Sequence, residues 1–328
     1  MTRARRHINI SLLLAVVVLL SPSFLLSSCS SGDDGMNEPT PQDKQEIRFN
    51  PGVWNFMEGT RAATFNNNED LQAGTFKCYA YEDGTTNLYI DGSTVSYSVD
   101  QWLFNDGKHY WPASGALNFF AFMPAELENT SCTFDPTAYN SSTNSDGYSE
   151  DSPRIVCTGL PVELSAGETT TQELIYAYTA DQSKVGQGAS GVTLTFKHPF
   201  ATVCFKMSEA SGINVTINSV TIEGVKNNGI CTFNGSETSW APSGEATSLV
   251  ITGNPATGNT PYLVLPQSFA ANLTFTVNAT WSDWSNVTKN VSASVNVGSW
   301  QSGYSYTYTF TLSKYALTVS TEKYTEQW

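Results

Sequence analysis

Apolar and polar side chains alternate along most of this chain, and this alternation restricts the fold more than any other feature. The clearest case lies near the C-terminus, where Tyr304, Tyr306, Tyr308, Phe310 and Leu312 alternate with Ser or Thr. Successive side chains of a strand point to opposite faces, so a period of two predicts a half-buried antiparallel strand. No three-turn window carries apolar residues at helical spacing between capping residues. The sequence therefore predicts a chain made of strands.

Similar strand-like segments follow each other with turn residues between them, which is typical of sandwiches and barrels. They cover residues 76–80, 95–99, 117–123, 174–178, 192–196, 203–207, 215–217, 220–222, 262–264, 275–281 and 291–297. The stretch 184–191 holds three Gly residues and no apolar period, so we expect a domain boundary there. We predict an all-β fold with two β-sandwich domains in series, over residues 46–188 and 189–314.

The N-terminus carries the features of a bacterial lipoprotein signal. A basic segment with Arg3, Arg5 and Arg6 precedes an apolar stretch over residues 10–20, and the lipobox-like sequence Leu-Ser-Ser-Cys ends at Cys29. We predict that residues 1–28 are a signal peptide and that Cys29 becomes a lipidated N-terminus anchored in the outer membrane. Residues 29–45 are polar and acidic, with two Pro residues, and are expected to form a tether.

The charge balance excludes some classes of function. Of the 16 Lys and Arg residues, three lie within residues 1–28, whereas none of the 30 Asp and Glu residues do, so the remainder carries 13 basic against 30 acidic residues, a net charge of −17. Such a surface repels phosphate groups, which disfavours nucleic acid as a partner. At 40% hydrophobic residues, the chain has enough apolar material for a core.

No motif for catalysis, metal binding or a cofactor is present. The Cys residues show no C-x-x-C spacing; Cys78 and Cys204 lie on apolar strand faces, and a bridge between Cys132 and Cys157 is left open. His109 and His198 read as packed residues and not as catalytic bases, and the chain lacks a nucleophile elbow, a zincin motif and a phosphate loop. We therefore expect a protein that is not an enzyme and has no metal site or cofactor.

A second apolar-studded segment follows the aromatic strand. Residues 315–328 form a tail that carries Leu317, Val319, Tyr324 and Trp328. Neither Gly nor Pro follows Leu312, so the sequence shows no hairpin signal there. Two readings stay open: an edge strand that returns onto its own sheet, and a strand that is donated to another molecule.

Several short segments occur in an order that resembles the fimbrillin family (Mfa-like, type V pilins) of Bacteroides-type bacteria. Each is weak alone, but their order and spacing together are fairly specific, from Cys29 to Trp328. They are lipobox Cys29, Thr60-Arg61-Ala62, Tyr110-Trp111-Pro112, Phe119-Phe120-Ala121-Phe122-Met123-Pro124, Leu194-Thr195-Phe196-Lys197-His198-Pro199-Phe200-Ala201-Thr202-Val203, Leu265-Pro266-Gln267 and Tyr304-Ser305-Tyr306-Thr307-Tyr308.

The resemblance implies two transthyretin-like β-sandwich domains, export as a lipoprotein and assembly into a surface fimbria that serves adhesion and biofilm formation. It also implies cleavage after Arg61, before Ala62, by an arginine-specific protease, with loss of the first strand, residues 46–57. The tail of the next subunit, with Leu317, Val319, Tyr324 and Trp328, then acts as the donor strand. The partners implied are other fimbrial subunits, head to tail, and a host or bacterial surface ligand. The tail ends at Trp328, so shaft, tip and accessory positions all stay open.

The main alternative is a glycan-binding surface lipoprotein with tandem sandwiches. Its sugar-stacking platform would consist of Trp281, Trp284 and Trp300. The competing reading places Trp281 in the core, where it continues the apolar period that begins at Phe275. A glycan binder has no use for an apolar tail or a cleavable first strand, so a fimbrial subunit is favoured.

Overall fold

The computed structural model describes residues 44–53, 67–83, 85, 87–126, 132–135, 154–165, 174–187, 190–208, 214–234, 237–256, 260–282, 286–313 and 316–324. Within these residues the fold is all-β, as predicted, except for one short helix. This helix, α1 (Asn68–Ala73), begins after Asn67, whose side-chain oxygen accepts the N–H of Asp70 at 2.9 Å. None of the described helices is long and apolar enough to cross a membrane.

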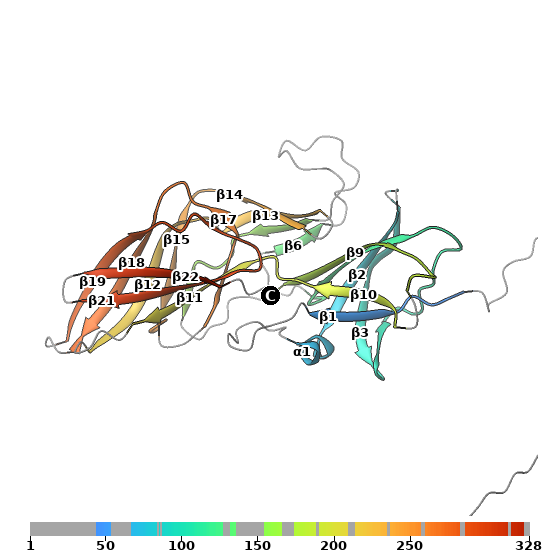
Figure 1. Cartoon of the computed structure of the whole chain (residues 1–328), viewed down its shortest axis with the longest axis horizontal. Helices are drawn as coiled ribbons and strands as arrows, with labels where there is room; N and C mark the ends of the chain where they lie inside the picture. The colour runs from blue at the N-terminus through green and yellow to red at the C-terminus, as the bar shows by residue number, and fades with distance from the viewer. Residues whose placement is uncertain are drawn as a thin grey trace, which may run out of the picture. The chain divides into compact units, whose positions relative to one another are not determined.

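The first core is enclosed by one seven-stranded sheet (Figure 1). Its two ends are joined by a backbone bridge between Tyr176 and Lys197, with N–H···O distances of 2.9 and 2.8 Å. Side chains from the strands meet inside, among them Phe76, Phe119 and Phe196, all fully buried. The order is β10 (Val192–Phe196), β1 (Phe49–Val53), β4 (Gln101–Phe104), β3 (Leu88–Ser98), β2 (Thr75–Glu82), β5 (Leu117–Met123) and β9 (Ile175–Gln182).

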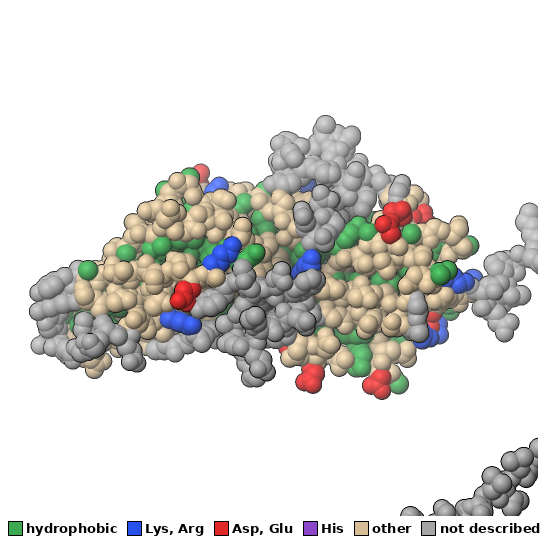
Figure 2. Space-filling view, viewed as in Figure 1, with side chains coloured by type: hydrophobic (Ala, Val, Ile, Leu, Met, Phe, Trp, Pro, Cys, Tyr) green, Lys and Arg blue, Asp and Glu red, His purple; other side chains and the backbone are tan. Residues whose placement is uncertain are grey.

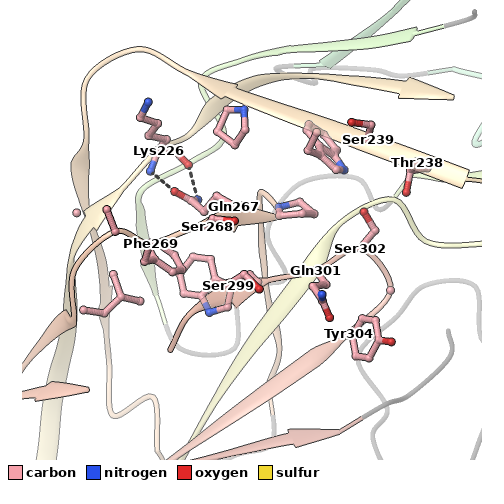
Figure 3. Close-up of a pocket in the computed structure, with 18 of the residues that line it drawn as sticks. Lys226, Thr238, Ser239, Gln267, Ser268, Phe269, Ser299, Gln301, Ser302 and Tyr304 are labelled. Carbon is pink, nitrogen blue, oxygen red and sulfur yellow. Dashed lines mark hydrogen bonds between the residues drawn. The ribbon is translucent and has the colours of Figure 1, made fainter. Parts of the chain in front are cut away.

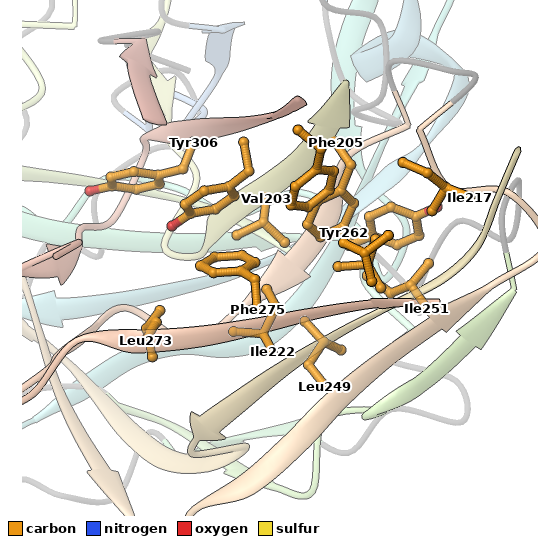
Figure 4. Packing of buried hydrophobic residues seen from close by; sticks show 14 of the residues in the cluster. Val203, Phe205, Ile217, Ile222, Leu249, Ile251, Tyr262, Leu273, Phe275 and Tyr306 are labelled. Carbon is orange, nitrogen blue, oxygen red and sulfur yellow. The ribbon is translucent and has the colours of Figure 1, made fainter. Parts of the chain in front are cut away.

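The second core lies between two sheets, and Figure 4 shows part of its packing. Phe275 contacts Tyr308 from the opposite sheet, with 4.5 Å between the ring centroids. One sheet has the order β19 (Val287–Val295), β18 (Leu273–Trp281), β12 (Val215–Val225), β15 (Thr247–Thr252) and β8 (Glu163–Ser165). The other has the order β16 (Tyr262–Val264), β11 (Ala201–Met207), β21 (Ser305–Leu312) and β22 (Leu317–Tyr324).

A four-stranded sheet covers the outer face of the seven-stranded sheet, where Phe120 and Tyr176 pack against Phe233. A disulfide joins Cys132 to Cys157, which confirms the bridge that the sequence left open. The order is β14 (Glu237–Ser243), β13 (Asn228–Asn234), β7 (Arg154–Thr158) and β6 (Cys132–Asp135), and a short separate ladder pairs β17 (Gln267–Ser268) with β20 (Ser299–Trp300).

Strand pairing crosses the expected boundary between residues 188 and 189. β10 completes the first sheet by pairing with β1, while β7 and β8 pair with β13 and β15 of the later half. The two-domain division at this position stays a prediction.

Candidate functional site

The first strand, β1, lies inside the seven-stranded sheet and not at its edge (Figure 1). It pairs in parallel with β10 over five residues, from Phe49 opposite Val192 to Val53 opposite Phe196. On its other side it pairs with β4 through one residue pair, Phe49 and Trp102. The strand therefore fills a gap in the sheet, yet its ladder on one side is short.

Phe49 anchors this strand in the first core. Its side chain is 6% exposed, and its ring makes edge contacts with Phe76, Phe104 and Phe119 at centroid distances of 5.7, 5.3 and 5.7 Å. Ile47 lies on the same face of the strand and is 2% exposed. Burying each such side chain stabilises the fold by about 1.5–3 kcal/mol. Removing the strand would thus open an apolar trench.

The backbone just before β1 is held on both sides. The N–H of Ile47 donates to the carbonyl of His109 at 2.9 Å, and the N–H of Trp111 donates to the carbonyl of Gln45 at 3.0 Å. On the opposite side, Gln187 and Val192 bond to the backbone of residues 46–48. We call the surface formed by β10, Trp102, residues 109–111 and Gln187 the strand seat.

The later half of β1 is held less tightly on the β4 side. A cavity of about 420 Å³ lies beside this half of the strand. Asn50 and Pro51 of β1 line it, opposite Leu71, Tyr97 and Trp102. Beyond Phe49 the described residues show no pairing between β1 and β4, so fewer hydrogen bonds oppose departure of this half of the strand.

The tail returns onto its own sheet. β22 pairs antiparallel with β21 over eight residues, from Leu317 opposite Leu312 to Tyr324 opposite Ser305. Of the two readings that the sequence left open, the structure shows the edge strand that returns onto its own sheet, although no Gly or Pro follows Leu312. The N–H of Ser313 donates to the carbonyl of Ala316 at 2.8 Å, and the Ser313 hydroxyl accepts the N–H of Ala316 at 3.0 Å.

The side chains of this edge strand are held loosely. Among residues 317–323 only Leu317 is buried, at 8% exposed, while Val319 packs partly against the same core. The remaining side chains of that stretch are polar or charged and wholly or partly exposed. Near its end, Lys323 places its ammonium 4.0 Å from the centre of the Tyr304 ring and donates to Gln301. Among the side chains of residues 317–323, Leu317 and Val319 are the apolar ones that detachment of β22 would expose.

Several predicted site residues lie outside the described part of the chain. These are Cys29, the cleavage pair Arg61 and Ala62, and Trp328; of Tyr324 only the backbone is described. Of the predicted first strand, residues 46–57, the description ends at Val53. Lipidation, cleavage and strand donation therefore stay predictions.

A broad groove of about 1300 Å³ lies in the later half of the chain (Figure 3). Hydroxyl and amide groups line it, together with the partly exposed Trp240 and Tyr304. Of the Trp platform considered for a glycan binder, Trp281 and Trp300 are each 2% exposed in the second core, and Trp284 lies outside the described residues. The reading of Trp281 as core is confirmed, and Trp281 and Trp300 cannot stack on a sugar.

Ser93, Asp106 and His109 lie together but do not form a catalytic relay. The Ser93 hydroxyl donates to Asp106 at 2.7 Å, and a single His109 nitrogen, Nε2, lies 3.3 Å from Ser93 and 3.1 Å from Asp106. A relay needs the carboxylate and the hydroxyl on different imidazole nitrogens. Desolvation raises the pKa of Asp106, but the hydrogen bonds from Ser93 and His109 outweigh it and lower that pKa.

Reactive or metal-binding groups are not gathered elsewhere in the described residues. They contain no cluster of three or more His, Cys, Asp or Glu side chains that could hold a metal ion. Cys78, Cys204 and Cys231 are buried and take part in no disulfide, and burial raises the pKa of Cys78 and Cys231 well above the usual value. On the face seen in Figure 2, the charged side chains are scattered.

A family model and several solved structures match this chain. A family model described as fimbrillin-like matches residues 60–328. The fold is similar to a fimbrial protein from Bacteroides vulgatus, at 15% identity and a TM-score of 0.56 over 86% of this chain and 99% of that one. It is also similar to a proposed cell adhesion protein from Bacteroides uniformis, at 16% identity and a TM-score of 0.52 over 88% and 99%. A search of curated proteins gave no match.

Proposed function

Because this chain belongs to the fimbrillin-like family, we propose that it is a structural subunit of a cell-surface fimbria that is assembled by strand exchange. In this proposal, cleavage after Arg61 frees the first strand. The tail of a second subunit, residues 315–328, then takes its place in the strand seat. Cys29 carries the lipid that holds the precursor in the outer membrane, and the assembled fimbria serves adhesion and biofilm formation.

The observation that carries the proposal is the position of β1. It is an internal strand, and the side chain of its residue Phe49 lies in the first core. Its five-residue ladder is formed with β10, which is far from it in the sequence. A sheet that loses an internal strand exposes unpaired backbone groups and an apolar trench, both of which are costly in water. An extended segment from another molecule would satisfy both.

The tail has the properties that such a donor needs. It is an edge strand, so its release breaks only one ladder. Leu317 and Val319 alternate with polar residues, which repeats the spacing of Ile47 and Phe49 in the first strand. Exchange of this kind is a head-to-tail contact that does not close on itself, so it propagates as a filament.

The fold and family also favour a structural role over catalysis. Ser93, Asp106 and His109 do not form a relay, and the described residues contain no cluster of side chains that could hold a metal ion. Strand exchange needs neither, because backbone pairing and apolar burial supply its free energy.

Limited proteolysis tests the proposal directly. The folded full chain is treated with an arginine-specific protease, and the products are identified by mass. We expect rapid cleavage between Arg61 and Ala62. The bond after Arg48 should resist, because the backbone of Arg48 is hydrogen-bonded to Gln187 and Val192. A precursor that is cut elsewhere but not at Arg61 would contradict the proposed processing step.

A second candidate function, saccharide binding, rests on the groove in Figure 3. Ser268, Ser302 and Thr238 offer hydroxyl groups there, and Trp240 and Tyr304 offer partly exposed rings of the kind that stack on sugars. A glycan array separates the two candidates. A pure shaft subunit shows no saccharide preference, whereas a binder loses its signal when Trp240 is replaced by Ala.

A further inference from the structure

The side chain of Gln187 is buried against the first strand and bonds to its backbone. It is 5% exposed. Its Oε1 accepts the N–H of Arg48 at 3.1 Å, and its Nε2 donates to the carbonyl of Glu46 at 3.1 Å. Neither bond involves a side chain of the strand. Gln187 therefore recognises an extended backbone and not a particular sequence.

These two bonds reproduce one step of a parallel ladder. In a parallel pair, the N–H of one residue donates to the carbonyl of the residue that precedes its opposite partner. The carbonyl of the same residue accepts the N–H of the residue that follows that partner. Gln187 bonds in this way around Ile47. The register that sets Phe49 opposite Val192 would set Ile47 opposite residue 190. The carboxamide of Gln187 makes the two hydrogen bonds expected of the backbone of residue 190, and it thereby lengthens the ladder between β10 and β1 by one step.

Two contacts outside the first strand orient this carboxamide. The indole Nε1 of Trp111 donates to Gln187 Oε1 at 2.9 Å, and because an indole N–H can only donate, it assigns the oxygen end of the amide. The turn that carries Gln187 is closed by its own N–H, which donates to the carbonyl of Ser183 at 3.0 Å. Neither the bond to Trp111 nor the bond that closes the turn uses an atom of β1.

We propose that Gln187 is a positioning residue of the strand seat that docks the backbone of whichever strand occupies it. Before cleavage this strand is the chain's own, residues 46–53. After cleavage it is the tail of a second copy, residues 317–323, whose Leu317 and Val319 repeat the spacing of Ile47 and Phe49. The second half of this inference rests on the proposed function, whereas the first half does not.

The first test uses the intact full chain and hydrogen exchange. Gln187→Met removes both backbone bonds at nearly unchanged size. We expect the amide of Arg48 to exchange about 10- to 100-fold faster, since a net hydrogen bond corresponds to roughly a tenfold change in equilibrium. Gln187→Met with Trp111→Phe also removes the indole donor that would otherwise be left unpaired, and should show the same local effect.

Gln267→Met is the matched control. Gln267 is a buried glutamine in the later half of the chain, 7% exposed, with bonds to the backbone of Lys226 and Leu265. Its replacement removes similar bonds away from the strand seat, so Arg48 should exchange as in the wild type. Equal exchange of Arg48 in wild type and Gln187→Met would overturn the inference.

The second test starts from the full chain cut at Arg61. Release of the N-terminal fragment is followed by mass, and uptake of a fluorescent peptide of residues 313–328 by anisotropy. Gln187→Met should release the fragment about 10- to 100-fold faster and bind the peptide more weakly by a similar factor.

The outcomes of the second test separate the two ideas. Wild type that binds the peptide, with Gln187→Met binding equally well, refutes the role of Gln187 in docking the second strand. If the wild type never takes up the peptide, strand exchange is refuted. Hydrogen exchange of the Arg48 amide in the intact chain then still decides whether Gln187 positions the chain's own first strand.

Discussion

Replacing Phe49 by Ala tests how much the first strand contributes to the fold. The ring is 6% exposed and contacts three other aromatic rings at 5.3–5.7 Å. A buried Phe→Ala substitution costs about 3–5 kcal/mol because it removes apolar contacts and leaves a cavity. We expect the upper part of this range, since edge contacts between rings add about 0.5–1.5 kcal/mol each.

The assay is urea unfolding of the full chain, followed by tryptophan fluorescence and circular dichroism. Asn50→Ala is the control, because Asn50 is the exposed neighbour on the same strand and its loss should change the free energy of unfolding by less than about 0.5 kcal/mol. A loss below about 1 kcal/mol for Phe49→Ala would refute the reasoning that this strand fills the core. Under the proposed cleavage after Arg61 the processed chain would lack residue 49, so its filaments should be unaffected.

Three further predictions concern other parts of the fold. Gly191→Ala should loosen the strand seat and speed exchange of the Val192 amide, because Gly191 has φ +91° and a Cβ there would lie 2.6 Å from the Arg48 carbonyl oxygen. Cys132→Ser with Cys157→Ser should lower the free energy of urea unfolding by about 3 kcal/mol, since the bridge closes a loop with a sequence separation of 25. Burial raises the pKa of Tyr262 to about 12, so in the unfolded chain Tyr262 ionises first, near its ordinary value of about 10, and stability falls as the pH rises from roughly 10 to 12. Burial also raises the pKa values of Tyr176 and Tyr308, so Tyr262→Phe should reduce this loss in urea titrations without abolishing it.

The all-β class follows from the sequence because strand periodicity is a local property. The aromatic strand shows both the success and the limit of this reasoning. Tyr306, Tyr308, Phe310 and Leu312 are buried as expected, but Ser305 and Thr307 are buried too. On this polar face Ser305 contacts Cys204 of the neighbouring strand β11, with 3.8 Å between Oγ and Sγ. Alternation predicts which face is apolar, but not what covers the other one.

The strand seat could not be derived from the sequence, because its parts meet only in three dimensions. Gln187 lies in the Gly-containing stretch 184–191, which reads as a boundary, and it contacts Arg48 across 139 positions of the chain. Trp111 is part of a visible Tyr-Trp-Pro segment, but nothing in that segment identifies its partner. The turn at Ser313 likewise shows no signal in the sequence. This turn contains neither Gly nor Pro, and the Ser313 hydroxyl stabilises it by accepting the N–H of Ala316.

A photo-reactive amino acid in place of Val319 tests the central claim most directly. Cleaved chains carrying it are allowed to assemble with isotope-labelled copies, irradiated and analysed by mass spectrometry. The account predicts cross-links from residue 319 of one copy to β10 or β4 of a copy with the other label, whereas the unassembled chain should cross-link only to its own β21 or β19. Assembled filaments that show only the links within one copy would contradict strand exchange through the tail.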